Sequence, residues 1–345
     1  MNDKYMEALG QYELETVSVR KGRGAWICET SLGLKLLKEY RGTVRRLEFE
    51  DQVLERLDTR TSLRADRYVR NKEGELLTVL GDGSRYILKD WFSDRECSMR
   101  DGYELRQAIS RLAMLHRQLR AIEFKEEWKM GSTCEQPPEA ELERHNREMQ
   151  RTRNYIRAKH RRSDFELSVI GSFEMFRDEA AEAAEGMGRL WQEEPAELEA
   201  AELAAGGIPR ERPFYLCHGD LDQHHLLMGG DYTAIIEYNR MHLGIQAEDL
   251  YRLMRKALEK HGWNLDLGMS MLESYERVLP MEKKERICLY YLFLYPEKYW
   301  KQLNFYNNTN KAWIPGRNTE KLKNLEQQQP ARRRFLARLG KDCGI

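Results

Sequence analysis

Three charged side chains have the types and order that phosphoryl transfer requires. Lys38 ends an apolar run, Glu50 lies in the helix-like stretch that follows, and Asp220 belongs to the turn His218-Gly-Asp220. In this chemistry a lysine neutralises the α- and β-phosphates, a helix acid holds that lysine, and an aspartate orients the proton of the acceptor. We therefore expect Lys38 and Glu50 to line a nucleotide pocket, with Asp220 as the candidate base.

Two further positions could bind the divalent metal that accompanies a nucleotide, and both carry unusual residue types. His225 follows Asp220 by five residues, and Glu237 ends the apolar run that begins at Ala234. Magnesium favours oxygen ligands in octahedral geometry, so an imidazole suits it poorly. A glutamate extends about one bond further than an aspartate, and a misplacement of about 1 Å can cost on the order of 10²-fold in rate. His225 and Glu237 are therefore candidate metal ligands of a degenerate kind.

The imidazoles of the same region permit a second interpretation. Histidine and carboxylate ligands suit zinc or manganese, so this loop could instead gather a transition metal. The spacing fits no established metal motif, however, and the side chains of adjacent histidines should diverge. The residues concerned are Asp220, Asp222, His224, His225 and Glu237.

Each candidate also has a structural explanation. Lys38 could be a surface lysine at a strand end, and Glu48 and Glu55 compete with Glu50 for the role of helix acid. Asp220 could order its loop through hydrogen bonds, as His218 is expected to do. His116, on an apolar helix face, is expected to pack in the core. Asp249 is expected to anchor a loop or cap a helix.

The elements before residue 95 have the pattern of a small sheet. Alternating apolar residues predict strands, and glycine-rich pairs predict the tight turns between them. The turn Gly22-Arg-Gly24 is sparse for a loop that cradles phosphates. The order β-β-β-α-β-β predicts an antiparallel sheet with one helix, which we take as an N-terminal lobe of residues 1–94. Its strands are expected at 14–19, 25–28, 33–38, 76–80 and 86–89, with the helix around 47–57.

The remainder, residues 95–345, is predicted to be a mostly helical C-terminal lobe. Apolar residues recur every three or four positions from Leu105 to Leu119, which is typical of an amphipathic helix. Residues of about 120–210 form a charged helical insert, rich in Glu and Ala from 173 to 205, which we interpret as a solvated face or a partner-binding helix. In the tail, the aromatic residues are expected to close the helical lobe and Arg332-Arg-Arg334 to be solvated.

The overall composition favours a globular chain without a nucleic-acid or membrane partner. Of the 345 residues, 41% are apolar and 33% charged, with 57 basic and 57 acidic side chains. This balance gives no global field for nucleic acid or a membrane surface. No apolar run approaches the roughly 20 residues that span a bilayer, and the start is polar. The six cysteines contain no Cys-x-x-Cys pair, so we expect an intracellular chain without a disulfide framework.

Several motifs together resemble the aminoglycoside phosphotransferase and choline kinase branch of the protein-kinase-like fold. They are Leu112-Ala-Met-Leu-His116, His218-Gly-Asp220-Leu, Glu237 at the usual position of a metal-binding aspartate, and Asp249-Leu250. The resemblance covers nearly the whole chain. It implies an α+β, two-lobed fold with a small antiparallel sheet lobe and a larger helical lobe. It also implies a pocket for ATP with Mg²⁺ or Mn²⁺, if that pocket is functional.

The C-terminal half is similar to one subgroup, the bacterial spore coat proteins of the CotS type. The similarity implies synthesis in the mother-cell cytoplasm during sporulation, deposition in the spore coat, and other coat proteins as partners. The stretches that carry it are Cys217-His-Gly-Asp220, Asp249-Leu-Tyr-Arg-Leu-Met-Arg-Lys256, Glu259-Lys-His-Gly-Trp263, Tyr295-Pro-Glu-Lys-Tyr-Trp300, Asn304-Phe-Tyr-Asn-Asn308 and Lys311-Ala-Trp313.

The chain departs from the superfamily at the two metal positions. An active member is expected to have Asn at position 225 and Asp at position 237, where this chain has His225 and Glu237. Our hypothesis is a pseudokinase that acts as a structural or interaction component of the spore coat, with Asp220 a vestigial base. The alternative is an active ATP-dependent phosphotransferase on a small-molecule or protein hydroxyl, with Asp220 as base. The residues alone leave enzymatic activity open.

Overall fold

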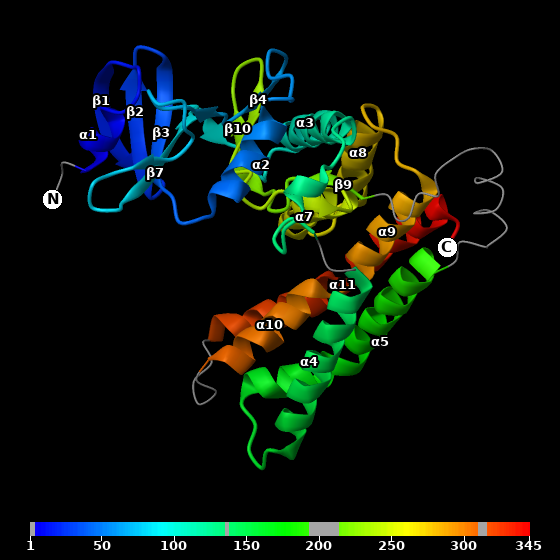
Figure 1. Cartoon of the computed structure of the whole chain (residues 1–345). Coiled ribbons are helices and arrows are strands. Elements are labelled where there is room, and N and C mark those ends of the chain that lie inside the picture. The colour runs from blue at the N-terminus through cyan, green and yellow to red at the C-terminus, as the bar shows by residue number, and fades with distance from the viewer. Residues whose placement is uncertain (1–3, 135–137, 193–213, 310–315) are drawn as a thin grey trace. The chain divides into compact units, whose positions relative to one another are not determined.

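The computed structural model describes residues 4–134, 138–192, 214–309 and 316–345 (Figure 1). The chain forms two compact units. The first comprises residues 1–134, 215–243 and 274–279, and the second comprises 135–214, 244–273 and 280–345. Both units are therefore assembled from segments that lie far apart in the sequence. The lobe boundary expected at residue 94 stays a prediction.

An antiparallel sheet dominates the N-terminal part of the first unit. Its strands follow the order β1-β2-β3-β7-β5, with β6 pairing β7, and each of these pairs is antiparallel. This confirms the predicted small antiparallel sheet and the α+β class. The strands are β1 (Thr16–Gly22), β2 (Ala25–Thr30), β3 (Gly33–Glu39), β5 (Tyr68–Val69), β6 (Thr78–Val79) and β7 (Arg85–Asp90).

Two helices accompany this sheet. The expected helix is α2 (Val44–Leu54), whose N-cap Thr43 accepts a hydrogen bond from the Arg46 backbone N–H. The additional helix α1 (Lys4–Leu9) is too short to produce a clear periodic pattern, and its Ala8 and Leu9 join the core on one side of the sheet. The sequence predicted one helix in this region, and the structure has two, of which α1 is short.

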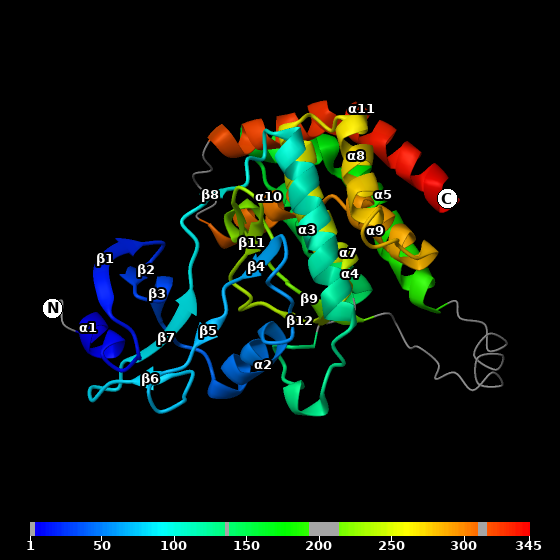
Figure 2. The ribbon, with the colours of Figure 1, turned by 90° about the horizontal axis from the view of Figure 1, so that it is seen from above.

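A second, four-stranded sheet in the first unit carries the loops that hold the candidate site. Its order is β4-β11-β10-β8, and β9 pairs β12 separately. The amphipathic helix α3 (Gly102–Arg120) is confirmed and contacts β4 and β9 (Figure 2). As expected, His116 on α3 is fully buried, with Nδ1 2.8 Å from the Tyr275 hydroxyl. The strands are β4 (Leu63–Ala65), β8 (Arg95–Glu96), β9 (Tyr215–Cys217), β10 (Leu226–Met228), β11 (Thr233–Ile235) and β12 (His242–Gly244), and two short 3-10 turns are η1 (Glu126–Trp128) and η2 (Gln223–His225).

The second unit consists mainly of helices. α5 packs on α4, α9 and α11, and α10 packs on α4 and α11. Asp249 is buried in the first turn of α7. The helices are α4 (Pro138–Ala158), α5 (Asp164–Gln192), α7 (Ala247–Lys260), α8 (Leu265–Glu276), α9 (Lys283–Leu294), α10 (Glu297–Asn308) and α11 (Gly316–Cys343), with the last residues of α8 belonging to the first unit.

The charged insert of the sequence prediction corresponds in part to α4 and α5. Its Glu/Ala-rich stretch has a buried face on α5 that includes Phe173, Phe176, Ala180 and Ala183, so only the other side of this helix is solvated. Residues 193–213 of the insert lie outside the described residues. Within the part of the chain that the structure describes, no helix has the length and apolar character needed to cross a bilayer.

Candidate functional site

Lys38 and Glu237, which are 199 residues apart in the sequence, meet in the first unit. The Lys38 ammonium on β3 donates to both oxygens of Glu237, at 3.1 Å to Oε1 and 2.9 Å to Oε2. The Glu237 backbone has a left-handed φ of 67°, and its N–H donates to Asp66 Oδ2 at 3.1 Å. Burial alone would raise the pKa of Glu237, but the Lys38 charge and its hydrogen bond lower it. The pocket lysine and the candidate metal acid therefore bind each other.

A buried ion pair, which the sequence did not predict, holds the backbone of Glu237. Lys89 Nζ lies 2.6 Å from Asp66 Oδ2, and the two side chains are 5% and 0% exposed. Burial raises the pKa of Asp66 to about 6, although the Lys89 ammonium opposes this rise. Asp66 Oδ1 makes no hydrogen bond within the described part of the chain. Asp66 thus joins a buried cation to the backbone of the residue that holds Lys38.

Glu50 is buried near this group but has other partners. Its Oε1 accepts a hydrogen bond of 2.6 Å from Arg46 Nε, and its Oε2 accepts one from the Tyr68 hydroxyl. Burial alone would lower the pKa of Lys89, but the charges of Asp66 and Glu50 raise it, so Glu50 lies within electrostatic range of the buried pair. The structure pairs Lys38 with Glu237, and it does not pair Lys38 with Glu50.

The turn His218-Gly-Asp220 is fixed by its own backbone and by one imidazole. Gly219 has a φ of 84°, and a Cβ there would lie 2.2 Å from the Arg240 carbonyl oxygen, so only glycine fits. His218 Nε2 lies 3.0 Å from the Ile236 carbonyl oxygen, to which it must donate, so its Nδ1 can accept the Asp220 N–H at 3.4 Å. His218 therefore has the structural role expected for it, and it couples Asp220 to the strand end that carries Glu237.

The Asp220 carboxylate is exposed and forms no hydrogen bond among the residues that the structure describes. Its charge nevertheless acts on His225. Burial would lower the pKa of His225, but the contact with Asp222 and the charges of Asp220 and Glu237 raise it. His225 Nδ1 lies 3.1 Å from Asp222 Oδ1, though not in hydrogen-bonding geometry. Asp220, His225 and Glu237 are thus close enough to influence one another.

The two adjacent histidines point to different partners, as the sequence suggested. His224 Nδ1 lies 2.7 Å from Glu96 Oε2, while His225 faces Asp222. Arg23, in the sparse Gly22-Arg-Gly24 turn, donates to the His224 carbonyl oxygen at 2.9 Å and forms an ion pair with Glu96. The hairpin that would cover nucleotide phosphates is therefore tied to the loop after Asp220.

The two candidate metal ligands already contact other charged side chains. Both Glu237 oxygens bind Lys38, and the Nδ1 of His225 faces the Asp222 carboxylate. Across residues 4–134, 138–192, 214–309 and 316–345, no group of three or more His, Cys, Asp or Glu side chains could hold a metal ion. The described residues therefore do not support the transition-metal interpretation of this loop.

Solved structures similar to this chain include kinases of small molecules. An aminoglycoside phosphotransferase from Alicyclobacillus acidocaldarius matches with a TM-score of 0.80 and 16% identity, over 98% of this chain and 96% of that one. An aminopropanol kinase associated with a microcompartment has a TM-score of 0.58 and 14% identity, over 98% of both chains. An amicoumacin kinase solved with AMP-PNP and Ca²⁺ has a TM-score of 0.56 and 11% identity, over 98% and 93%.

At these identities the likeness shows the fold alone. The kinase-like phosphotransferase fold predicted from the motifs is thereby confirmed, and the more specific resemblance to CotS-type proteins stays a prediction. No protein-family model and no curated protein sequence matches the chain.

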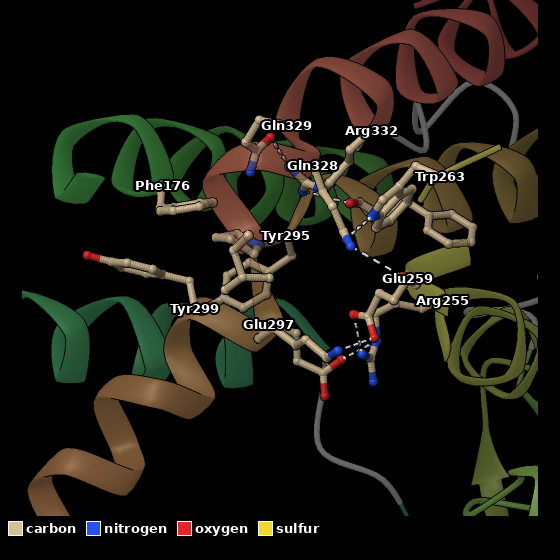
Figure 3. A pocket seen from close by; sticks show the side chains of 14 residues that line it. Phe176, Arg255, Glu259, Trp263, Tyr295, Glu297, Tyr299, Gln328, Gln329 and Arg332 are labelled. Atoms are coloured by element: carbon tan, nitrogen blue, oxygen red, sulfur yellow. Dashed lines mark hydrogen bonds and ion pairs between the residues drawn. The ribbon is translucent and has the colours of Figure 1, made fainter. Parts of the chain in front are cut away.

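A cavity in the second unit gathers three of the stretches that resemble the coat proteins (Figure 3). Arg255 and Glu259 come from α7, Trp263 follows that helix, and Glu297 begins α10. Arg255 NH1 lies 2.7 Å from Glu259, and its Nε lies 3.0 Å from Glu297. The charged groups thus form ion pairs with one another, which indicates a structural junction between helices.

The basic tail contributes one residue to this junction, contrary to expectation. Arg332 is 6% exposed, and its guanidinium binds Glu179 Oε2 at 2.7 Å and the carbonyl oxygens of Phe293 and Leu294. The expectation of a solvated Arg332 is therefore wrong, because buried carbonyls and a carboxylate satisfy its donors. Arg333 and Arg334 are exposed as expected, and the aromatic residues Tyr299 and Tyr306 are buried in the helical unit.

Proposed function

We propose that this chain is a nucleotide-binding pseudokinase that serves as an interaction component of the bacterial spore coat. The observation that carries the pseudokinase part is the double contact of Glu237 with Lys38. Phosphoryl transfer depends on electrostatic stabilisation of the γ-phosphoryl group by magnesium and fixed cations. An acid whose two oxygens both accept from a lysine is less available to that metal.

Lys38 is the group that would contact the nucleotide. Its side chain is 36% exposed, so its ammonium can reach a phosphate oxygen without leaving Glu237. Glu50, expected beside it, contributes to the buried charges around Lys89 instead. Asp220 is in this proposal a vestigial base, because Glu237 held by Lys38 and the imidazole of His225 would bind magnesium poorly.

The test combines calorimetric titration with ATP and a sensitive assay for ADP release. We expect ATP to bind and ADP release to remain at the buffer rate with either Mg²⁺ or Mn²⁺ present. Asp220→Asn should leave both results unchanged. Turnover above the buffer rate that disappears in Asp220→Asn would show an active kinase and overturn the pseudokinase proposal.

The second candidate is an active phosphotransferase, and the exposed Asp220 carboxylate favours it. No described residue hydrogen-bonds this carboxylate, so it can accept the proton of an acceptor hydroxyl. The hydroxyl oxygen would then bond to the γ-phosphorus as the bond to the leaving ADP breaks. This candidate requires Glu237 to exchange Lys38 for a metal. Metal-dependent turnover lost in Glu237→Ala would favour it.

The spore-coat part of the proposal is supported by the late stretches that resemble CotS-type proteins. Three of them supply residues to the junction of α7, α10 and the segment around Trp263. We propose that the helices joined there bind other coat proteins. We propose synthesis in the mother-cell cytoplasm followed by deposition in the coat. Detection of the protein in purified coats by antibody tests this, and its absence from coats of sporulating source cells contradicts it.

A further inference from the structure

We infer that the nucleotide site of this chain binds its ligand without a divalent metal, because Lys38 held by Glu237 takes over the cationic role. This inference rests on the proposed function, namely that the first unit binds a nucleotide. The ligand of this site would be a nucleoside di- or triphosphate without a bound metal. The inference follows from how the charged groups of the site are paired.

In this site the lysine is held by Glu237 and not by the helix acid Glu50, which differs from the usual arrangement for phosphoryl transfer. A helix acid normally holds the lysine, and the acid at the strand end holds the metal. Here the helix acid Glu50 uses its two oxygens for Arg46 and Tyr68. The strand-end acid Glu237 then binds the lysine. Glu237 is thereby the lysine-positioning residue of this site.

Glu237 is also held from its backbone, which opposes a turn toward a metal. Its N–H donates to Asp66, and Asp66 is fixed by the buried Lys89. Glu237 therefore lies close to the cation Lys38, with a second cation, Lys89, beyond Asp66. A metal ion arriving at this carboxylate would have to share it with Lys38 or displace that cation, and the repulsion between the two cations raises the cost of binding the metal.

Lys38 retains the capacity to bind a phosphate. An ammonium has three donors, and Glu237 accepts two of them at 2.9 and 3.1 Å. Lys38 forms no other hydrogen bond in the described part of the chain, and its side chain is 36% exposed. The remaining N–H can therefore bond a phosphate oxygen while Glu237 keeps the side chain in place. A charged hydrogen bond of this kind is among the stronger ones in proteins.

The experiment is calorimetric titration of the full chain with ATP in EDTA and, separately, with Mg²⁺. We expect the two dissociation constants to agree within about twofold. Lys38→Met should weaken binding about tenfold or more in both conditions, as expected for loss of a charged hydrogen bond. Lys35→Met is the matched control. Lys35 is on the same strand as Lys38 and forms a 2.7 Å ion pair with Asp90 of β7. Its replacement therefore reports the cost of a lost lysine and should leave ATP affinity unchanged.

Three outcomes of the titration decide whether the nucleotide binds without a metal. Binding that is lost in EDTA and restored by Mg²⁺ overturns the metal-free inference but leaves nucleotide binding intact. Absence of ATP and ADP binding in both conditions, with the folded state verified by circular dichroism, overturns the proposed function itself. Equal binding with and without metal, lost in Lys38→Met but kept in Lys35→Met, supports the inference.

A gain of metal dependence provides an independent test. In the double variant Glu237→Asp/His225→Asn, the shorter carboxylate loses the double contact with Lys38, and an amide oxygen replaces an imidazole that suits magnesium poorly. We expect this variant to bind ATP at least about tenfold more tightly with Mg²⁺ than in EDTA. If a folded double variant remains indifferent to metal, the contact between Glu237 and Lys38 is not what excludes the metal, and the inference is wrong.

Discussion

Replacing Glu297 by glutamine should remove a charge-dependent part of the stability of the second unit. The Glu297 carboxylate at the start of α10 accepts a hydrogen bond of 2.9 Å from the Tyr251 hydroxyl and lies 3.0 Å from Arg255 Nε. Burial alone would raise the pKa of Glu297, but Arg255 and Lys301 outweigh burial and lower it from 4.5 to about 2. The ionised carboxylate is therefore favoured in the folded state.

The size and the sign of the effect follow from this pKa. A drop from 4.5 to about 2, at about 1.4 kcal/mol per pKa unit, corresponds to about 3 kcal/mol of stability. A pKa that is lower in the folded state stabilises the protein above the unfolded-state pKa. The contribution is complete at neutral pH and is lost progressively between about pH 5 and about pH 2. Glutamine keeps the shape and the bond to Tyr251 but not the charge.

Urea unfolding followed by circular dichroism and by tryptophan fluorescence measures this difference. Glu297→Gln should lower the free energy of unfolding by about 3 kcal/mol at neutral pH and by about 1.4 kcal/mol near pH 3. The control Glu320→Gln, an exposed acid on α11, should change it by no more than about 0.5 kcal/mol. A Glu297→Gln deficit that is equal at both pH values would refute the electrostatic reasoning.

Three further perturbations test the site. Gly219→Ala should lower stability by about 2 kcal/mol or more, seen as a lower melting temperature, because φ is 84° and the added Cβ meets a carbonyl oxygen. Lys89→Met should cost about 3 to 5 kcal/mol in urea unfolding by leaving buried Asp66 unpaired, and adding Asp66→Asn should recover most of this. Arg23→Ala should accelerate hydrogen exchange in the β1–β2 turn while changing global stability by less than about 1 kcal/mol.

Residue types and spacing were enough to find the acids and lysine of the site but not all of their partners. A strand end or a tight turn next to a polar residue predicts a site position at Lys38, Asp220 and Glu237. Such a pattern is local, so it does not depend on the tertiary fold. Glu50 was chosen by helical spacing alone. Its partner Arg46 lies four residues earlier on the same helix face, a local pair that competes with any distant lysine.

One feature of the sequence indicates the buried ion pair between Asp66 and Lys89. Lys89 follows Tyr86-Ile-Leu in a strand, and period-two alternation places it on the same face as the buried Ile87. A lysine on such a face is almost never buried without a partner, so its presence predicts a buried acid. Which acid it would be could not be predicted, because β5 and β7 pair through the sheet topology rather than through sequence proximity.

The acid that pairs with Lys38 depends on contacts that another acid, Glu50, makes elsewhere. Arg46 and Tyr68 satisfy Glu50 within the N-terminal sheet and its helix, so Lys38 has no acid on that side. A glutamate at position 237 reaches it with two oxygens while its backbone stays bonded to Asp66. An aspartate with the same backbone would end about one bond short of Lys38 and leave oxygens for a metal. The extra methylene of Glu237 and the local pairing of Glu50 therefore act in the same direction, toward a lysine-centred site.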